Sequence, residues 1–193
     1  MMAPDWAGPD DAALIARSLS EAECFGLLFD RHAAAIFRYV TRRLGPDAAD
    51  DVVADTFLAA FRQRRAYDPA RVDARPWLYG IATNVIARHR RSETRFLRAI
   101  ARTGTDPAAE PVDELVTHRV AAHAASRKVA AAIAALPQNQ RDVLLLTATG
   151  LSYDEIARAL GIPAGTVSSR LVRARARVRA ALGGTNPAEA GQE

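Results

Sequence analysis

Apolar residues recur along this chain at the spacing of an α-helix, and the alternation typical of strands is nearly absent. Positions three and four residues apart share one face of a helix, and an apolar face needs a partner to cover it. The first such face comprises Phe25, Leu28, Phe29, His32, Ile36, Tyr39 and Val40. The second comprises Ala49, Val52, Val53, Phe57, Ala60 and Phe61. We therefore predict an all-α fold.

Glycine and proline set the ends of the predicted helices. Gly45-Pro46 separates the first two helices, and Pro76 suits the first turn of a third helix from about Arg75 to Arg91. Further helices are predicted near residues 118–136, 138–149, 152–160 and 164–182, with breaks at Pro137 and Gly150.

The distribution of aromatic residues indicates two small domains. After Phe96, Tyr153 is the only aromatic residue, so we expect two separate cores. Residues 103–117 contain two prolines and four acidic residues but no basic residue, which favours an extended linker. The predicted division is a first domain over 20–100, an acidic linker over 101–118, a second domain over 119–182 and a frayed tail over 183–193.

Composition narrows the classes of function. The formal net charge is +4, and no apolar run approaches the roughly 20 residues of a membrane span. A secretory signal is not recognisable, so a cytoplasmic protein without membrane insertion is expected. Cys24 is expected to be a buried core thiol. His32, His89, His118 and His123 show no metal-site or catalytic spacing, so we predict no cofactor, metal or enzyme activity.

Residues 151–182 have the pattern of a helix-turn-helix. Ser152 and Glu155 form a capping box, and Gly161 ends the helix that follows. Ile162 would plug the space between the two helices. The second helix has an outer face of hydroxyl and guanidinium groups without an acidic residue, which suits DNA. A helical hairpin with a solvated arginine face is the alternative.

Motifs in both halves resemble the bacterial sigma factors. Residues 50–57, DDVVADTF, and 75–84, RPWLYGIATN, are similar to sigma region 2. Residues 150–157, GLSYDEIA, and 165–171, GTVSSRL, are similar to sigma region 4. The two halves follow in the family's order without a sizeable insert, which resembles the extracytoplasmic-function (ECF) group. The resemblance implies a subunit of RNA polymerase that directs promoter-specific transcription initiation.

The resemblance implies that the second helix docks on the clamp coiled coil of the largest polymerase subunit. Asp47, Asp51 and Asp55 are spaced to form one exposed acidic stripe, with Val53 and Phe57 as support. Simple solvation of this stripe is the alternative. Region 4 is expected to contact the flap region of the polymerase.

The third helix and the loop before it are expected to bind the melted minus-ten strand. Rings can stack on bases while arginines hold phosphates. The expected residues are Tyr67, Arg75, Trp77, Tyr79, Asn84, Arg88 and Arg91. The resemblance places Asn84 and the loop at residues 67–75 around a base flipped from this element. A core position is the alternative for Trp77.

The last helix is expected to bind the minus-thirty-five duplex. The expected residues are Thr166, Ser168, Ser169, Arg170, Arg173 and Arg177. The family often has a basic residue where this chain has Ser168, so base recognition is expected to depend more on Ser169 and Arg173.

One further partner, two readings of the linker and two competing functions follow. The resemblance implies an anti-sigma factor, and the acidic linker is either a plug in the polymerase channel or a solvated tether. A helix-turn-helix regulator that acts on duplex DNA without polymerase is the first competing function. A helical enzyme that uses its histidines is the second.

Overall fold

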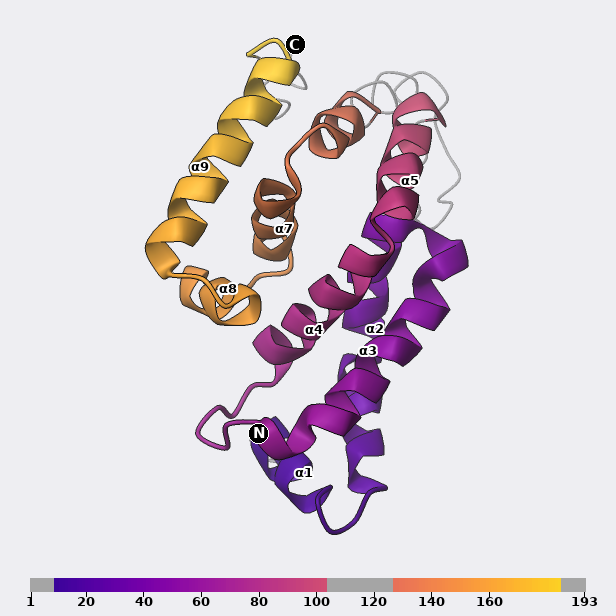
Figure 1. Cartoon of the computed structure of the whole chain (residues 1–193), viewed down its shortest axis with the longest axis vertical. Helices are drawn as coiled ribbons and strands as arrows, with labels where there is room; N and C mark the ends of the chain where they lie inside the picture. Colours follow the sequence, from indigo (N-terminus) through magenta and orange to yellow (C-terminus); the bar gives the residue numbers. More distant parts are fainter. Residues whose placement is uncertain (1–8, 104–126, 185–193) are drawn as a thin grey trace, which may run out of the picture.

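The computed structural model describes residues 9–103 and 127–184 as a compact set of helices (Figure 1). In the first half these are α1 (Asp11–Arg17), α2 (Cys24–Leu44), the 3-10 turn η1 (Pro46–Ala48), α3 (Ala49–Gln63), the 3-10 turn η2 (Arg64–Ala66), α4 (Arg75–Arg88) and α5 (Arg90–Thr103). In the second half they are a helical segment at 127–134, α7 (Gln138–Thr147), α8 (Tyr153–Leu160) and α9 (Ala164–Ala181). The all-α prediction is confirmed for these residues.

The packing of α2 against α3 follows the predicted apolar faces with one exception. Leu28, Ile36 and Val40 of α2 are buried, as is Val52 of α3. Phe29, which we expected on the inner face, is 42% exposed. Its neighbour Leu28 takes the inward position on that turn, so Phe29 lies at the edge of the helix pair.

Two features of the first half differ from the sequence-based prediction. The short helix α1 was not predicted; the Asp10 carboxylate caps it by accepting a hydrogen bond from the Ala13 N–H at 2.7 Å. The third helix, predicted to end near Arg91, ends at Arg88 as α4, and the helix α5 that begins at Arg90 was not predicted. His89 lies between them with φ −97° and ψ 18°, outside helical geometry.

Gly45 makes the tight turn between α2 and α3 possible. Its φ of 92° lies in the left-handed region, where a side chain would be strained. A Cβ atom at this position would also lie 2.7 Å from the ring of Phe96 in α5. The glycine therefore permits both the turn and the close packing of α5 across it.

The expectation of two separate cores is wrong. One continuous cluster of buried residues joins Leu78 and Ile86 of α4 to Val143, Ile156 and other residues of the second half. Figure 1 shows α8 beside the first part of α4, and the two helices are in contact. Helical periodicity identifies an apolar face but not the helix that covers it, so this contact could not be read from the pattern.

Residues 104–118 of the predicted linker and most of the tail lie outside the described residues, as do His118 and His123, whereas residues 101–103, predicted as linker, belong to α5. Among the described helices, none combines the length and apolarity needed to cross a lipid bilayer.

Candidate nucleic-acid interface

The predicted helix-turn-helix is formed by α8 and α9. The Ser152 hydroxyl accepts a hydrogen bond from the Glu155 N–H at 3.3 Å, and Glu155 Oε2 accepts one from the Ser152 N–H at 2.7 Å. Gly161 ends α8 in the left-handed region with a φ of 63°. The Ile162 N–H then donates to the Ala157 carbonyl at 3.0 Å, which closes the turn. The capping-box prediction is confirmed.

One side of α9 is apolar and the other basic. Val167, Leu171 and Ala174 are buried against the rest of the helix-turn-helix, and Val178 is half-buried. The predicted duplex-binding residues lie on the remaining surface: Ser168, Arg173 and Arg177 are exposed, whereas Thr166, Ser169 and Arg170 are half-buried. The Ser169 hydroxyl donates to the Thr166 carbonyl at 3.1 Å.

The arginines of α9 are free to meet an external anion. Across the described parts of the chain, no acidic side chain forms an ion pair with Arg173, Arg175, Arg177 or Arg179. A helix that presents unpaired guanidinium groups along one side suits both base edges and phosphates.

The loop at residues 67–75 borders a cavity of about 320 Å³ in front of α4. The rings of Tyr67 and Trp77 meet edge to face at 4.9 Å between centroids. The Tyr67 hydroxyl donates to the Arg71 carbonyl at 2.6 Å, which folds the loop back on itself. Glu155 and Arg158 of α8 line the opposite side of this cavity.

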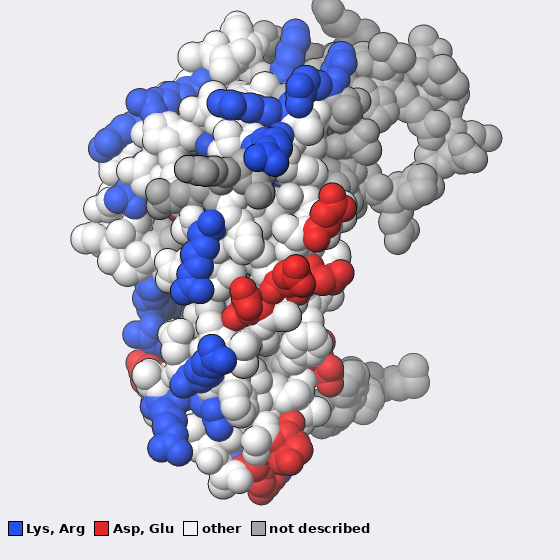
Figure 2. Space-filling model, turned by 45° about the vertical axis from the view of Figure 1, so that its right-hand side comes forward, with Lys and Arg blue, Asp and Glu red and all other residues white. Residues whose placement is uncertain are grey.

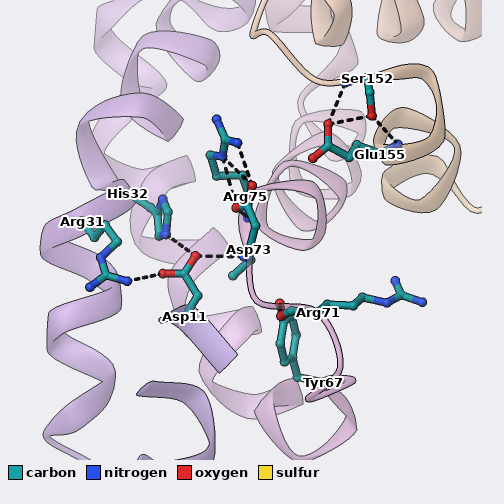
Figure 3. A network of polar contacts seen from close by, with 10 residues as sticks. Asp11, Arg31, His32, Tyr67, Arg71, Asp73, Arg75, Ser152 and Glu155 are labelled. Carbon is teal, nitrogen blue, oxygen red and sulfur yellow. Dashed lines mark hydrogen bonds and ion pairs between the residues drawn. The ribbon is translucent and has the colours of Figure 1, made fainter. Parts of the chain in front are cut away.

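Arg75 is held at the entrance to α4 by an acidic neighbour. Its Nε and Nη2 atoms donate to Asp73 Oδ2 at 2.9 and 2.7 Å, with Asp73 on the loop as Figure 3 shows. This hydrogen bonding raises the pKa of Arg75. Burial alone would raise the pKa of Asp73, but the bonds and charge of Arg75 lower it. Arg75 is thus a fixed cation beside the cavity.

The remaining residues expected at the melted strand fall into three groups. Asn84 and Arg88 are exposed one turn apart on α4. Tyr79 is buried, and its ring meets that of Tyr39 at 5.1 Å. Tyr79 therefore does not reach the surface in this arrangement, contrary to expectation. The side chain of Arg91 lies outside the described residues.

The expected docking stripe lies on the solvent side of α3. Asp51 and Asp55 are exposed on α3, and Asp47 is exposed on η1 just before it. Val53 and Phe57 are buried beneath them. On the side of the molecule that carries α3, Figure 2 shows a band of acidic side chains across the middle of the surface.

Exposed apolar residues lie on α3 and on the neighbouring α2, and the sequence analysis did not predict their exposure. Leu58 of α3 is 46% exposed, and Leu27 and Phe29 of α2 are 51% and 42% exposed. Phe29 meets Phe57 at 4.8 Å between ring centroids. The available signal was Leu58 itself, because it follows Asp55 by three residues and so shares its face.

The histidines form no metal centre in the part of the chain that the structure describes. No group of three or more His, Cys, Asp or Glu side chains there could hold a metal ion. His32 is instead buried beside Asp11, at 2.8 Å from Nε2 to Oδ2.

Comparison with known proteins identifies the family of this chain. The chain is 36% identical over 177 residues to the ECF RNA polymerase sigma factor SigC of Mycobacterium tuberculosis, an alignment that covers 86% of this chain and 89% of SigC. The chain belongs to the ECF sigma factors. Sigma-70 region 2 matches residues 28–96, and sigma-70 region 4 matches residues 126–178. This protein is therefore an RNA polymerase sigma factor that acts in promoter-specific transcription initiation.

Two further relatives agree with this assignment. The RNA polymerase sigma factor CnrH of Cupriavidus metallidurans is 35% identical over 189 residues, which cover 90% of this chain and 96% of CnrH. The structure of CnrH in complex with the cytosolic domain of CnrY superposes with a TM-score of 0.62, over 91% of this chain and 99% of CnrH, at 31% identity. The sigma factor RpoE, in a complex with the anti-sigma factor NepR from Bartonella quintana, shares the fold at a TM-score of 0.57 and 23% identity, over 83% of this chain and 97% of RpoE.

In this ECF sigma factor a buried polar network joins region 2 to region 4. Arg43 of α2 is fully buried and donates to Asp142 of α7 at 2.6 Å. Arg43 also donates to the Tyr39 hydroxyl at 2.7 Å, which lies 2.9 Å from the Thr83 hydroxyl of α4. A buried guanidinium needs such partners, because an isolated charge in the interior is very unfavourable. Arg43 and Asp142 are 99 residues apart, so no local sequence signal predicts their pairing.

The backbones of α4 and α8 also meet directly. A Cβ atom on Gly80 of α4 would collide with the carbonyl oxygen of Ala159 in α8. This contact and the shared cavity place region 4 over the start of the helix expected to bind the minus-ten strand.

Proposed function

We propose that this ECF sigma factor docks on the core polymerase through α3. The exposed carboxylates of Asp51 and Asp55 provide a charged face, and the adjacent Leu58 provides apolar area. An acidic rim beside exposed apolar residues suits a helical partner with a basic surface. The buried Val53 and Phe57 support this face from below.

The melted minus-ten strand binds along α4 and the loop at 67–75. The half-buried Trp77 packs edge to face against Tyr67 at the cavity, and Asn84 and Arg88 continue the same side of α4. Asp73 holds the Arg75 guanidinium in place, and the guanidinium has five N–H donors, so donors remain for a phosphate. Tyr79 supports α4 from within, because its ring packs on Tyr39. Aromatic and basic groups together suit single-stranded DNA.

The minus-thirty-five duplex binds at α9, with region 4 also contacting the flap region of the polymerase. Ser168 and Ser169 lie toward the start of α9, which is the end that contacts base edges in this motif, and the longer side chain of Arg173 extends from the middle of the helix. Arg177 and Arg179 lie further along and suit phosphates.

The observation that supports this function best is the presence of three distinct surfaces on one chain. They are the acidic face of α3, the aromatic and basic side of α4, and the basic side of α9. A regulator that only binds duplex DNA needs the third of these surfaces alone. The chain acts by binding, and the polymerase that it directs supplies the chemistry in the cytoplasm.

An anti-sigma factor is a further partner that we propose. CnrH has been solved with the cytosolic domain of CnrY. The exposed apolar residues Leu27, Phe29 and Leu58 offer a surface for such a partner. Competition between this partner and the core polymerase would follow, because both would use the face of α3.

Run-off transcription tests the function. Core polymerase is mixed with promoter fragments from the source genome, with and without the purified chain. We expect discrete transcripts only when the chain is present. Binding of the chain to the same fragments without any stimulation of transcription would indicate a separate regulator and contradict the proposal.

A further inference from the structure

The carboxylate of Asp11 joins three parts of the first half. Its side chain is 5% exposed and accepts hydrogen bonds from Arg31 Nη1 at 2.6 Å and His32 Nε2 at 2.8 Å, both on α2. A third bond comes from the backbone N–H of Ala74 at 2.9 Å. Figure 3 shows Asp11 between the two α2 side chains and the segment that enters α4. Asp11 precedes residue 28, where the match to region 2 begins.

Asp11 also bonds to the loop through its backbone. Its N–H donates to the carbonyl of Val72 at 3.2 Å. The two bonds therefore fix the loop on both sides of Asp73, the residue that holds Arg75. Ala74 directly precedes the first residue of α4. The position of Asp11 thus sets where the loop ends and where α4 starts.

This anchored segment forms one wall of the cavity at the minus-ten surface. Val72 and Asp73 line the cavity together with Tyr67 and Trp77. Asp11 is not among the lining residues. Its influence on a bound base would pass through the loop.

We propose that Asp11 is a positioning residue for base capture, and that it holds the loop at 67–75 in the conformation that accepts a flipped base of the minus-ten element. The inference rests on the proposed function of this surface. A carboxylate suits the task because its two oxygens accept several hydrogen bonds at once and donate none. An asparagine keeps one acceptor oxygen and no charge, so at least one of the three bonds is lost and the bond from the Ala74 N–H is no longer charge-assisted.

The test uses polymerase holoenzyme and two single-stranded minus-ten oligonucleotides. One oligonucleotide is intact, and the other lacks the flipped base. For Asp11→Asn we expect affinity for the intact strand to fall about tenfold, as loss of a charge-assisted hydrogen bond would produce. Affinity for the strand without the base is expected to change less than about twofold, because the base that the loop holds is absent.

The matched control is Arg31→Gln. Arg31 donates to the same carboxylate and to the Pro9 carbonyl, and neither of these hydrogen bonds reaches the loop. We expect both oligonucleotides to bind within about twofold of wild type. Affinity for a minus-thirty-five duplex should be unchanged in both variants.

The outcomes distinguish the role of Asp11 from the proposed function of the minus-ten surface. An equal loss on both oligonucleotides, or no loss on either, would overturn the role of Asp11. If wild-type holoenzyme did not prefer the minus-ten strand to a scrambled strand, the proposed function itself would fail. If Asp11→Asn does not assemble with polymerase, Asp11→Glu is compared instead, since it keeps the charge but displaces the carboxylate by one methylene. A base-dependent loss is again expected, and its absence would overturn the proposal.

Discussion

Arg173 lies exposed on α9 without an ionic partner among the described residues, and we propose that it contacts a base edge of the minus-thirty-five duplex. Replacement of Arg173 by alanine is expected to weaken binding of the minus-thirty-five duplex by about 1 to 3 kcal/mol and to relax the preference at one base pair. Arg179→Ala is the matched control, because Arg179 is exposed near the end of the same helix. Arg179→Ala should weaken binding to all DNA sequences alike and should lower the slope of log affinity against log salt concentration by about 1. Equal behaviour of the two variants in salt titrations would contradict these roles.

Asp11 is expected to make the free energy of unfolding depend on pH in the acidic range. Burial would raise the pKa of its carboxyl, but hydrogen bonds from His32, Ala74 and Arg31 lower it to about 2 from the ordinary 3.8. The stabilisation is therefore complete above about pH 3.8 and is lost as the pH falls toward 2. Urea unfolding at a series of pH values should show a smaller decrease over this range for Asp11→Asn. An identical decrease in the variant and wild type would show that Asp11 does not contribute.

Single residues were predictable from sequence where their structure is local. The capping box of Ser152 and Glu155 depends on residues three positions apart, and it forms as expected. Tyr79 was expected at the DNA surface but packs on Tyr39, which is 40 residues away in the chain. The sequence shows that Tyr79 is aromatic and helical, but not which helices surround it.

The helix α3 is expected to determine polymerase binding. Charge reversal by Asp51→Arg with Asp55→Arg should lower affinity for the core enzyme at least about tenfold, because a basic partner surface would then be repelled. The matched control is Glu21→Arg with Glu23→Arg, which makes the same change in net charge before the start of α2. It should retain affinity in a pull-down with core polymerase. Equal losses for both pairs would mean that net charge, and not the face of α3, controls binding.

The contact between α4 and α8 depends on Gly80. In Gly80→Ala the added Cβ atom collides with the Ala159 carbonyl, so regions 2 and 4 should separate. Gly26→Ala in α2 is the control, because its Cβ atom meets no neighbour. Both changes raise helix propensity by about 1 kcal/mol, so they differ only in the contact. The distance between two spectroscopic labels, one on region 2 and one on region 4, should lengthen in Gly80→Ala and not in Gly26→Ala. An unchanged distance in Gly80→Ala would contradict the tight contact.

At the scale of elements, helix positions were easier to predict than helix partners. The bounds of α8 and α9 follow from Ser152, Gly161 and Pro163, which act within one turn. The end of α4 was predicted to within three residues, but α5 was missed because the residues after His89 were assigned no helix before the linker. The close approach of α4 and α8 was missed because a helical glycine indicates no particular partner.

Regions 2 and 4 are in contact in this structure, whereas the proposed binding of both promoter elements requires them to be apart. Elements centred about 25 base pairs apart lie about 85 Å apart on duplex DNA at roughly 3.4 Å per base pair. In the structure, α8 of region 4 contacts α4 of region 2. The two regions must therefore separate before they can bind both elements at once. Separation would break the Arg43–Asp142 ion pair and expose the buried cluster between the two regions. The binding free energy of the polymerase at α3 and of the promoter DNA would offset this loss.

Detection of melted promoter DNA with permanganate tests the central claim most directly. Core polymerase and the chain are added to promoter DNA together and separately, and reactive thymines near the start site are mapped. We expect reactive thymines in the minus-ten element only when both proteins are present, and their loss with the Asp51→Arg and Asp55→Arg pair. Reactivity with the chain alone, or with core polymerase irrespective of the chain, would contradict the account.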